Sequence, residues 1–149
     1  MAVSKAFSVL VQRLSVASRS ESPVLLVGET GTGKRQAATS LHRSSSRGQA
    51  RFVTINCIGI TDDRFELELC GSQSSSFEMN RKGALFLAEA GTIYLHEISE
   101  LSKRSQSLLL RCLESGVYSP VGGSDVIRCD VRVIASSSAN ITAMVESGQ

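Results

Sequence analysis

The residues with the clearest chemical potential form one run, Gly28-Glu29-Thr30-Gly31-Thr32-Gly33-Lys34-Arg35. The run follows the apolar segment Val24–Val27, and a buried strand leading through a Gly-Lys loop into a helix is typical of a phosphate-binding P-loop. Glycines let the backbone wrap around phosphate oxygens with its N–H groups inward, and Lys34 supplies positive charge for the terminal phosphates. The pattern departs from G-x-x-x-x-G-K-[ST] only at Arg35. It predicts binding of a nucleoside di- or triphosphate, and the alternative is a glycine-rich turn without a ligand.

Composition favours one globular domain in a reducing compartment. The chain has 149 residues, 42% of them apolar, and a net charge of +2 from 16 basic and 14 acidic residues. This balance argues against a nucleic-acid or membrane partner, and no apolar stretch approaches the ~18–20 residues that a membrane span needs. No signal-peptide pattern opens the chain, so we expect a cytoplasmic protein. The four cysteines show no C-x-x-C pair, which indicates structural thiols and no zinc site: Cys57, Cys70, Cys112 and Cys129.

Apolar spacing predicts strands that alternate with helices. We expect helices around Phe7–Leu14, Gln36–Leu41, Phe65–Leu69, Ala84–Glu89 and Ser107–Glu114, and a short one at the end of the chain. Buried strands are expected at Val24–Val27, Phe52–Ile55, Thr92–Leu95 and Val131–Ala135. We expect a β-hairpin with arms Val117–Val121 and Asp125–Cys129 around Gly122-Gly123, and a loop from Gly71 to Lys82. The alternation implies an α/β fold with a parallel sheet between two layers of helices.

Several segments occur in an order that resembles a known family: Gly28–Lys34, Phe52–Cys57, Glu68–Gly71, Gly91–Ile98, Leu109–Glu114, Val121–Ser124 and Asp130–Ala135. Together they resemble the central AAA+ ATPase domain of sigma-54-dependent transcriptional activators, the bacterial enhancer-binding proteins. The resemblance runs from about residue 4 to the end of the chain. It implies a P-loop NTPase fold with an inserted β-hairpin, binding of ATP or ADP, self-association as a ring, and remodelling of the sigma-54 form of RNA polymerase.

The resemblance also assigns roles to single residues. By analogy Glu97 polarises the attacking water, Asn56 switches the position of that carboxylate, and Ser137 senses the γ-phosphate, while residues 28–35 hold the nucleotide. His96 stands where the family has the Asp that organises Mg²⁺. Because Mg²⁺ prefers oxygen ligands, we expect its binding to be weakened and His96 to be a strand-end residue without a metal. Arg35 cannot ligate Mg²⁺ either, although it can pair with phosphate.

Two further positions depart from the family pattern. Ser138 stands in place of an Asn and lacks the paired donor and acceptor of an amide. The family's sigma-54-contact loop, Gly-Ala-Phe-Thr-Gly-Ala, is replaced here by Ser75-Ser76-Phe77-Glu78-Met79-Asn80. The glycines are gone and Glu78 replaces the Thr, so we do not expect productive contact with sigma-54. The alternative is a solvated loop with an incidental Phe77.

Residues 1–149 are thus expected to be a single, incomplete AAA+ domain without its arginine-finger segment, last strand and lid. The strand Pro23–Val27 then becomes an exposed edge, and no helix-turn-helix allows direct DNA binding. Two functions remain open: an ATP-binding regulatory core with weakened hydrolysis, or a fully active ATPase domain completed by a longer parent protein. A P-loop kinase or GTPase is disfavoured, because the other family-like segments would then be coincidence.

Overall fold

The computed structural model describes residues 4–74 and 80–148, and its centre is a four-stranded parallel sheet. The strand order is β1-β8-β5-β2, with bounds β1 Val24–Val27, β2 Phe52–Asn56, β5 Thr92–His96 and β8 Arg132–Ser137. In register, Asn56 lies opposite His96 and Val27 lies opposite Ser137. The carboxyl ends of all four strands therefore meet at one edge of the sheet.

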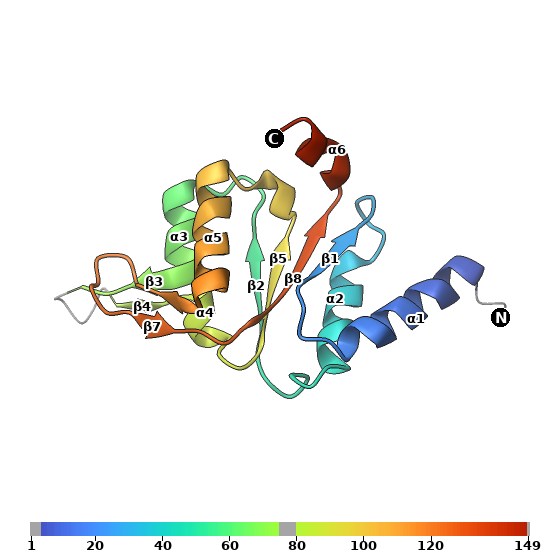
Figure 1. Ribbon diagram of the computed structural model, residues 1–149, viewed down its shortest axis with the longest axis horizontal. Helices are drawn as coiled ribbons and strands as arrows, with labels where there is room; N and C mark the ends of the chain where they lie inside the picture. Colours follow the sequence, from blue (N-terminus) through green and yellow to red (C-terminus); the bar gives the residue numbers. More distant parts are fainter. Residues whose placement is uncertain (1–3, 75–79, 149) are drawn as a thin grey trace.

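Helices cover both faces of this sheet, which confirms the predicted three-layer α/β architecture (Figure 1). Their bounds are α1 Lys5–Ser18, α2 Lys34–Arg43, α3 Asp62–Cys70, α4 Ala84–Leu87, α5 Lys103–Ser115 and α6 Ile141–Glu146, with a 3₁₀ turn at Ile98–Glu100. None of the helices in the described ranges is both long and apolar enough to cross a membrane.

The alternation of side chains along the strands divides the core into two parts. On one face, Leu41 of α2 packs against Tyr94 and Ile134. On the other face, Ile93 and Leu95 contribute to a larger cluster with the apolar sides of α3 and α5. Both faces of β5 and β8 are therefore buried, as expected for the central strands of a parallel sheet.

Helix α5 begins earlier than the apolar pattern predicts. Ser102 is its N-cap, and the Ser102 hydroxyl accepts a hydrogen bond from the backbone N–H of Ser105 at 3.1 Å. The helix thus starts at Lys103 rather than Ser107, because a polar first turn with a good cap needs no apolar residue.

The predicted β-hairpin forms, but its arms are shorter than expected. Strand β6, Val117–Tyr118, pairs antiparallel with β7, Ile127–Arg128. Val121 is not part of the hairpin arm, because it forms a parallel bridge with Ser72. Gly122-Gly123 is consequently not a two-residue turn but part of a longer connection.

The expected loop from Gly71 to Lys82 is wrong at both ends. Strand β3, Gly71–Ser72, pairs antiparallel with β4, Arg81–Lys82. These residues show no alternation of apolar side chains, so the pairing depends on tertiary contacts such as the Val121 N–H···O=C Gly71 hydrogen bond of 2.9 Å. Residues 75–79, which include most of the predicted sigma-54-contact segment, lie outside the described residues.

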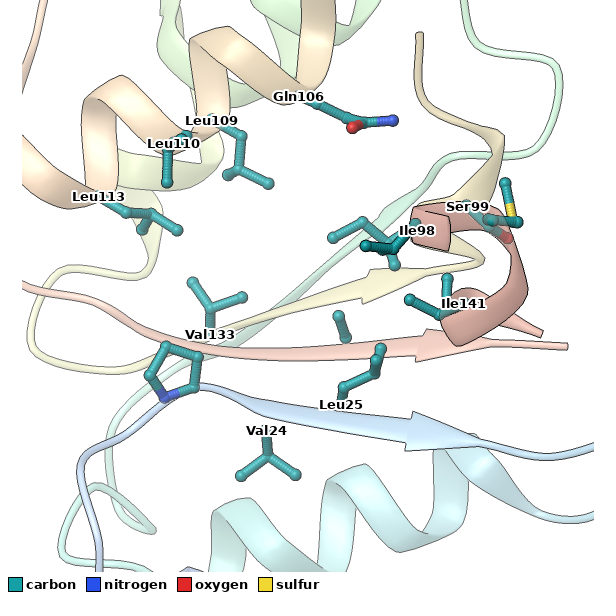
Figure 2. A pocket seen from close by; sticks show the side chains of 14 residues that line it. Val24, Leu25, Ile98, Ser99, Gln106, Leu109, Leu110, Leu113, Val133 and Ile141 are labelled. Atoms are coloured by element: carbon teal, nitrogen blue, oxygen red, sulfur yellow. The ribbon is translucent and has the colours of Figure 1, made fainter. Parts of the chain in front are cut away.

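Strand β1 lies at the edge of the sheet, as predicted. The same strand was also expected to be buried, and this is only partly correct. Leu25 is 45% exposed and Val27 is 60% exposed, and β8 is its only strand neighbour in the described part of the chain. The exposed face of β1 borders an apolar groove of about 480 Å³, which Leu25, Leu110 and Ile141 help to line (Figure 2). This groove has no charged lining residue and is therefore unsuited to phosphate.

The packing of Phe65 predicts a large effect of its removal. Phe65 is fully buried at the α3 side of the sheet. We expect Phe65→Ala to lower the free energy of unfolding by about 3–5 kcal/mol, because it opens a cavity in the core. Phe86→Ala is the matched control, since Phe86 is 47% exposed. Loss of its cation–π contact with Lys82 should lower the free energy of unfolding by about 1 kcal/mol or less. Equal losses in urea unfolding would contradict this packing.

Candidate functional site

The P-loop continues β1 and leads directly into α2. Gly28 N donates to the Ser137 carbonyl at 3.2 Å, which ties the start of the loop to the end of β8. The loop then turns through a Thr32 N–H···O=C Glu29 hydrogen bond of 3.3 Å. Gly33 is the N-cap of α2 at φ +86°, a left-handed conformation that glycine adopts without strain. It supplies no side-chain cap, so the N-terminal N–H groups of α2 are available to an anion.

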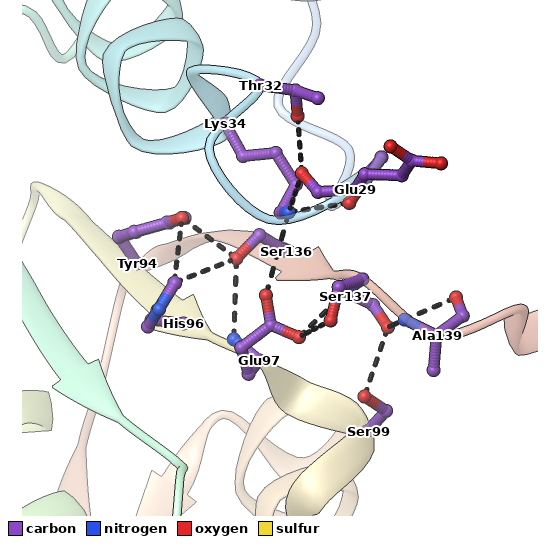
Figure 3. Close-up of polar contacts among 12 residues, drawn as sticks. Glu29, Thr32, Lys34, Tyr94, His96, Glu97, Ser99, Ser136, Ser137 and Ala139 are labelled. Atoms are coloured by element: carbon purple, nitrogen blue, oxygen red, sulfur yellow. Dashed lines mark hydrogen bonds and ion pairs between the residues drawn. The ribbon is translucent and has the colours of Figure 1, made fainter.

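Lys34 is folded back over this loop. Its Nζ donates to the carbonyl oxygens of Gly28 at 2.6 Å and Glu29 at 2.9 Å, and lies 3.7 Å from Glu97 Oε1 (Figure 3). The side chains of Lys34 and Glu97 are each only 9% exposed. The ammonium group therefore sits at the centre of the loop, where a phosphate would be a stronger anionic partner than the two neutral carbonyls.

Glu97 follows the end of β5 and is held by the residue after β8. Its Oε2 accepts hydrogen bonds from the backbone N–H and the hydroxyl of Ser138, both at 2.8 Å (Figure 3). Burial opposes the charge on Glu97, but the two Ser138 hydrogen bonds and the nearby Lys34 outweigh it, so the pKa of Glu97 is lowered. Glu97 is therefore a fixed, ionised carboxylate beside the P-loop lysine.

The imidazole of His96, the last residue of β5, lies beside the hydroxyl groups of Tyr94 and Ser136. Its Nδ1 lies 3.4 Å from the Tyr94 hydroxyl and 3.3 Å from Ser136 Oγ, and Tyr94 donates to Ser136 at 2.8 Å. No cluster of three or more His, Cys, Asp or Glu side chains suited to a metal occurs in residues 4–74 and 80–148. With an imidazole at position 96 and Glu97 engaged by Lys34 and Ser138, the donor set does not fit a hard cation such as Mg²⁺.

These groups line one pocket. Its volume of about 480 Å³ is within the usual size range of small-molecule sites. Its lining contains most of the predicted loop residues together with His96 and Glu97: Thr30, Gly31, Gly33, Lys34, Arg35, Gln36, Ile58, His96, Glu97, Glu100 and Ser138. Backbone N–H groups, two cationic side chains and a helix N-terminus at one pocket are groups that fit a nucleotide phosphate chain.

Five predicted site residues do not line this pocket: Gly28, Glu29 and Thr32 of the loop, and Asn56 and Ser137 outside it. Asn56 lies at the end of β2, and its Oδ1 accepts from the backbone N–H of Ile58 at 3.1 Å. Ser137 is buried, and its hydroxyl donates to Ser99 at 3.0 Å and to the Ala139 carbonyl at 3.3 Å. The roles inferred for Asn56 and Ser137 stay predictions.

The contact of Ser138 with Glu97 was not predicted from the sequence, where Ser138 indicated only the loss of an amide. A serine hydroxyl and its own backbone N–H together supply two donors to one carboxylate oxygen. The available signal was its place directly after β8, which pairs with β5, the strand that Glu97 follows. Without the strand order, that proximity could not be deduced.

Comparison with known proteins agrees with this geometry. The family described as "Sigma-54 interaction domain" matches residues 1–149. A Nif-specific regulatory protein of Bradyrhizobium diazoefficiens is 41% identical over 145 residues, which cover 95% of this chain and 25% of that protein. The crystal structure of NtrX from Brucella abortus in complex with ADP is similar with a TM-score of 0.90 and 33% identity, covering 99% of this chain and 33% of NtrX.

A second similar structure is the P-loop NTPase domain of a sigma-54 transport activator from E. coli. It has a TM-score of 0.63 and 23% identity, and the match covers 99% of this chain and 84% of that one. The fold is therefore that of a P-loop NTPase. With the family match over its whole length, the chain belongs to the sigma-54 interaction domain family. It spans about a quarter of the length of the curated relative from Bradyrhizobium.

The Ser138–Glu97 contact predicts a pH-dependent effect on stability. A carboxylate with a lowered pKa stabilises the fold above its ordinary pKa of 4.5, and this contribution is lost as the pH falls through its folded-state value. Ser138→Ala removes one charge-assisted hydrogen bond, and should lower the free energy of unfolding by about 1.5–3 kcal/mol at pH 7. The deficit should shrink as Glu97 becomes protonated. Urea unfolding between pH 7 and pH 3 measures it.

Ser107→Ala is the matched control for this experiment. Its hydroxyl donates to the Lys103 carbonyl within α5 at 2.9 Å, and within residues 4–74 and 80–148 it has no hydrogen bond to a carboxylate, so its small effect should not vary with pH. A Ser138→Ala deficit that is equally constant with pH would contradict the proposed link between Ser138 and the charge of Glu97.

Proposed function

We propose that this chain is the ATP- and ADP-binding core of a bacterial transcriptional regulator of the sigma-54-activator type, with weakened hydrolysis. The observation that carries the proposal is Lys34, whose Nζ lies between the P-loop carbonyls and Glu97 at the N-terminus of α2. The crystal structure of NtrX in complex with ADP supports the choice of ligand, since the matched part of NtrX is 33% identical to this chain.

In this proposal the chain's own groups bind and orient the nucleotide. The phosphates accept hydrogen bonds from the loop and from the first turn of α2, and Lys34 turns from the carbonyls of Gly28 and Glu29 to a phosphate oxygen. Arg35 adds a second positive charge at the rim of the pocket. Loss of the Lys34 contact leaves Glu97 with Ser138 as its partner, and the carboxylate can then accept a hydrogen bond from a water molecule.

Weakened hydrolysis follows from the groups around Glu97. A carboxylate that orients water is present, but His96 provides no oxygen ligand for Mg²⁺ at the end of β5. The site as built is better suited to holding a nucleotide than to stabilising charge on a transferred phosphoryl group. Nucleotide occupancy would then set a state of the regulator instead of driving repeated turnover.

Self-association is proposed on family membership. The family also implies sigma-54 as a partner, but we do not expect productive contact through a loop that carries Glu78 and lacks the family's glycines. Because the chain corresponds to a quarter of its curated relative, the arginine fingers, the outer strand beside β1 and the lid are expected in a longer parent protein. We also infer a bacterial cytoplasmic setting, and DNA contacts made outside this segment.

Removal of the P-loop lysine tests nucleotide binding. Lys34→Ala should weaken binding of ATP and ADP by about 1.5–3 kcal/mol, because a charge-assisted hydrogen bond to phosphate is lost. Isothermal titration calorimetry on the purified chain measures the change. Lys103→Ala is the control, since Lys103 is exposed and contacts the Gly148 carbonyl at 2.9 Å. Equal affinities of wild type and Lys34→Ala would sink the proposal.

Restoring a carboxylate at position 96 tests the inferred effect on Mg²⁺. In the unmodified chain, we expect ATP affinity to change little when Mg²⁺ is removed with EDTA, and turnover near background. His96→Asp should make ATP binding depend on Mg²⁺, because an oxygen ligand returns to the end of β5. His96→Asn separates loss of the imidazole from gain of a charge. Family-typical ATP turnover by the unmodified chain would show that the weakened-hydrolysis proposal is wrong.

A further inference from the structure

Three of the four cysteines meet in one corner of the fold, far from the P-loop in sequence. Cys70 is the last residue of α3 and Cys112 lies in α5, and both belong to the same buried cluster with exposed fractions of 4% and 2%. Both side chains line the same pocket, and the interaction between their two thiols shifts the pKa of each. Cys129 lies beside them, with its Sγ 3.9 Å from the Cys112 carbonyl oxygen.

A pocket gives small molecules access to the thiol pair. It has a volume of about 490 Å³ and is lined by Cys70 and Cys112 together with Arg111, Tyr118 and the segment that follows β6. Hydrogen peroxide is only slightly larger than water, so burial of the two side chains beneath this pocket does not exclude it. A metal is not the natural occupant, because the described residues contain no suitable cluster of ligands.

The two thiols are chemically unequal. The hydrogen bond from Cys70 lowers the pKa of Cys112, burial opposes this shift, and the charge of Arg111 assists it. The same hydrogen bond, with burial, raises the pKa of Cys70. Burial also raises the pKa of Cys57, to about 12, and the pKa of Cys129. Cys112 therefore has the most thiolate character of the four cysteines, and thiolate is the reactive form.

We propose that Cys70 and Cys112 form an oxidisable dithiol that a peroxide converts into a disulfide. The Cys112 sulfur attacks one peroxide oxygen, the O–O bond breaks, and a sulfenic acid and one water are formed. The Cys70 sulfur then attacks the Cys112 sulfur and displaces hydroxide, which takes the Cys70 proton and leaves as a second water. Two thiols are oxidised, one hydrogen peroxide is reduced, and the products are one disulfide and two waters.

The disulfide would join two elements at the base of the β3–β4 hairpin. Cys70 directly precedes Gly71, which begins β3 at φ +75°. A Cβ built at Gly71 would lie 2.3 Å from the Arg81 carbonyl oxygen, so the base of this hairpin is tightly packed. A covalent bond from α5 to the residue before β3 would therefore restrict movement of the hairpin relative to the sheet. This inference does not depend on nucleotide binding.

Peptide mapping of the oxidised chain tests the proposal. The reduced chain is treated with hydrogen peroxide, unreacted thiols are alkylated, and the digest is analysed by mass spectrometry without reductant. We expect a cross-linked peptide pair that contains Cys70 and Cys112, lighter by two hydrogen atoms and released by dithiothreitol. A predominant Cys112–Cys129 bond, only intermolecular bonds, or no disulfide would overturn the proposal.

Three variants sharpen this result. Cys70→Ser should leave a sulfenic acid at Cys112 that dimedone traps, and Cys112→Ser should abolish the cross-link. Cys57→Ser is the matched control, because Cys57 is also buried but should leave the cross-link unchanged.

Hydrogen exchange at residues 71–72 and 81–82 should slow on oxidation of the wild-type chain, and not in Cys70→Ser. Unchanged exchange in oxidised wild type would contradict the restriction of the hairpin. Mapping of wild type decides the proposal even if a variant fails to fold.

Discussion

The position of β8 between β1 and β5 is the constraint on which the candidate site depends. β8 is buried along its whole length and pairs in parallel with both neighbours, so the three strands end together at one edge of the sheet. This arrangement places Glu97 after β5 within 3.7 Å of Lys34 at the end of the loop that follows β1, and within hydrogen-bonding distance of Ser138 after β8. Glu97 lies 63 residues after Lys34 and Ser138 lies 41 residues after Glu97, and only the strand order brings them together.

The electrostatics of that edge explain why the site is poised for an anion. Lys34 and Glu97 are nearly buried and compensate one another, with backbone carbonyls and Ser138 satisfying their remaining hydrogen bonds. The Lys34–Glu97 distance of 3.7 Å is longer than a direct hydrogen bond, so the lysine is held mainly by the loop carbonyls. A phosphate can replace these neutral partners while Ser138 keeps the carboxylate in place.

Sequence patterns predicted the central strands and the P-loop because both depend on local features. The apolar runs before Gly28 and around Tyr94 can be recognised without knowledge of distant contacts. The pairing of Ser72 with Val121 and Arg81 could not be predicted, because it follows from tertiary packing of polar segments without periodicity. The contact of Ser138 with Glu97 could not be predicted either, because it depends on the strand order. The edge position of β1 was predicted, but the exposure of Leu25 and Val27 was not, because an apolar run does not show which side chains another layer covers.

A bound nucleotide should replace the P-loop carbonyls as the partner of Lys34 with one of its phosphates. A crystal structure of the chain with ADP tests it most directly. The account predicts a β-phosphate enclosed by residues 28–34, with Lys34 Nζ bound to a phosphate oxygen and moved away from the Gly28 carbonyl, where it now lies at 2.6 Å. ADP bound elsewhere on the chain, or a lysine still bonded to Gly28 and Glu29 beside the bound phosphate, would contradict the account.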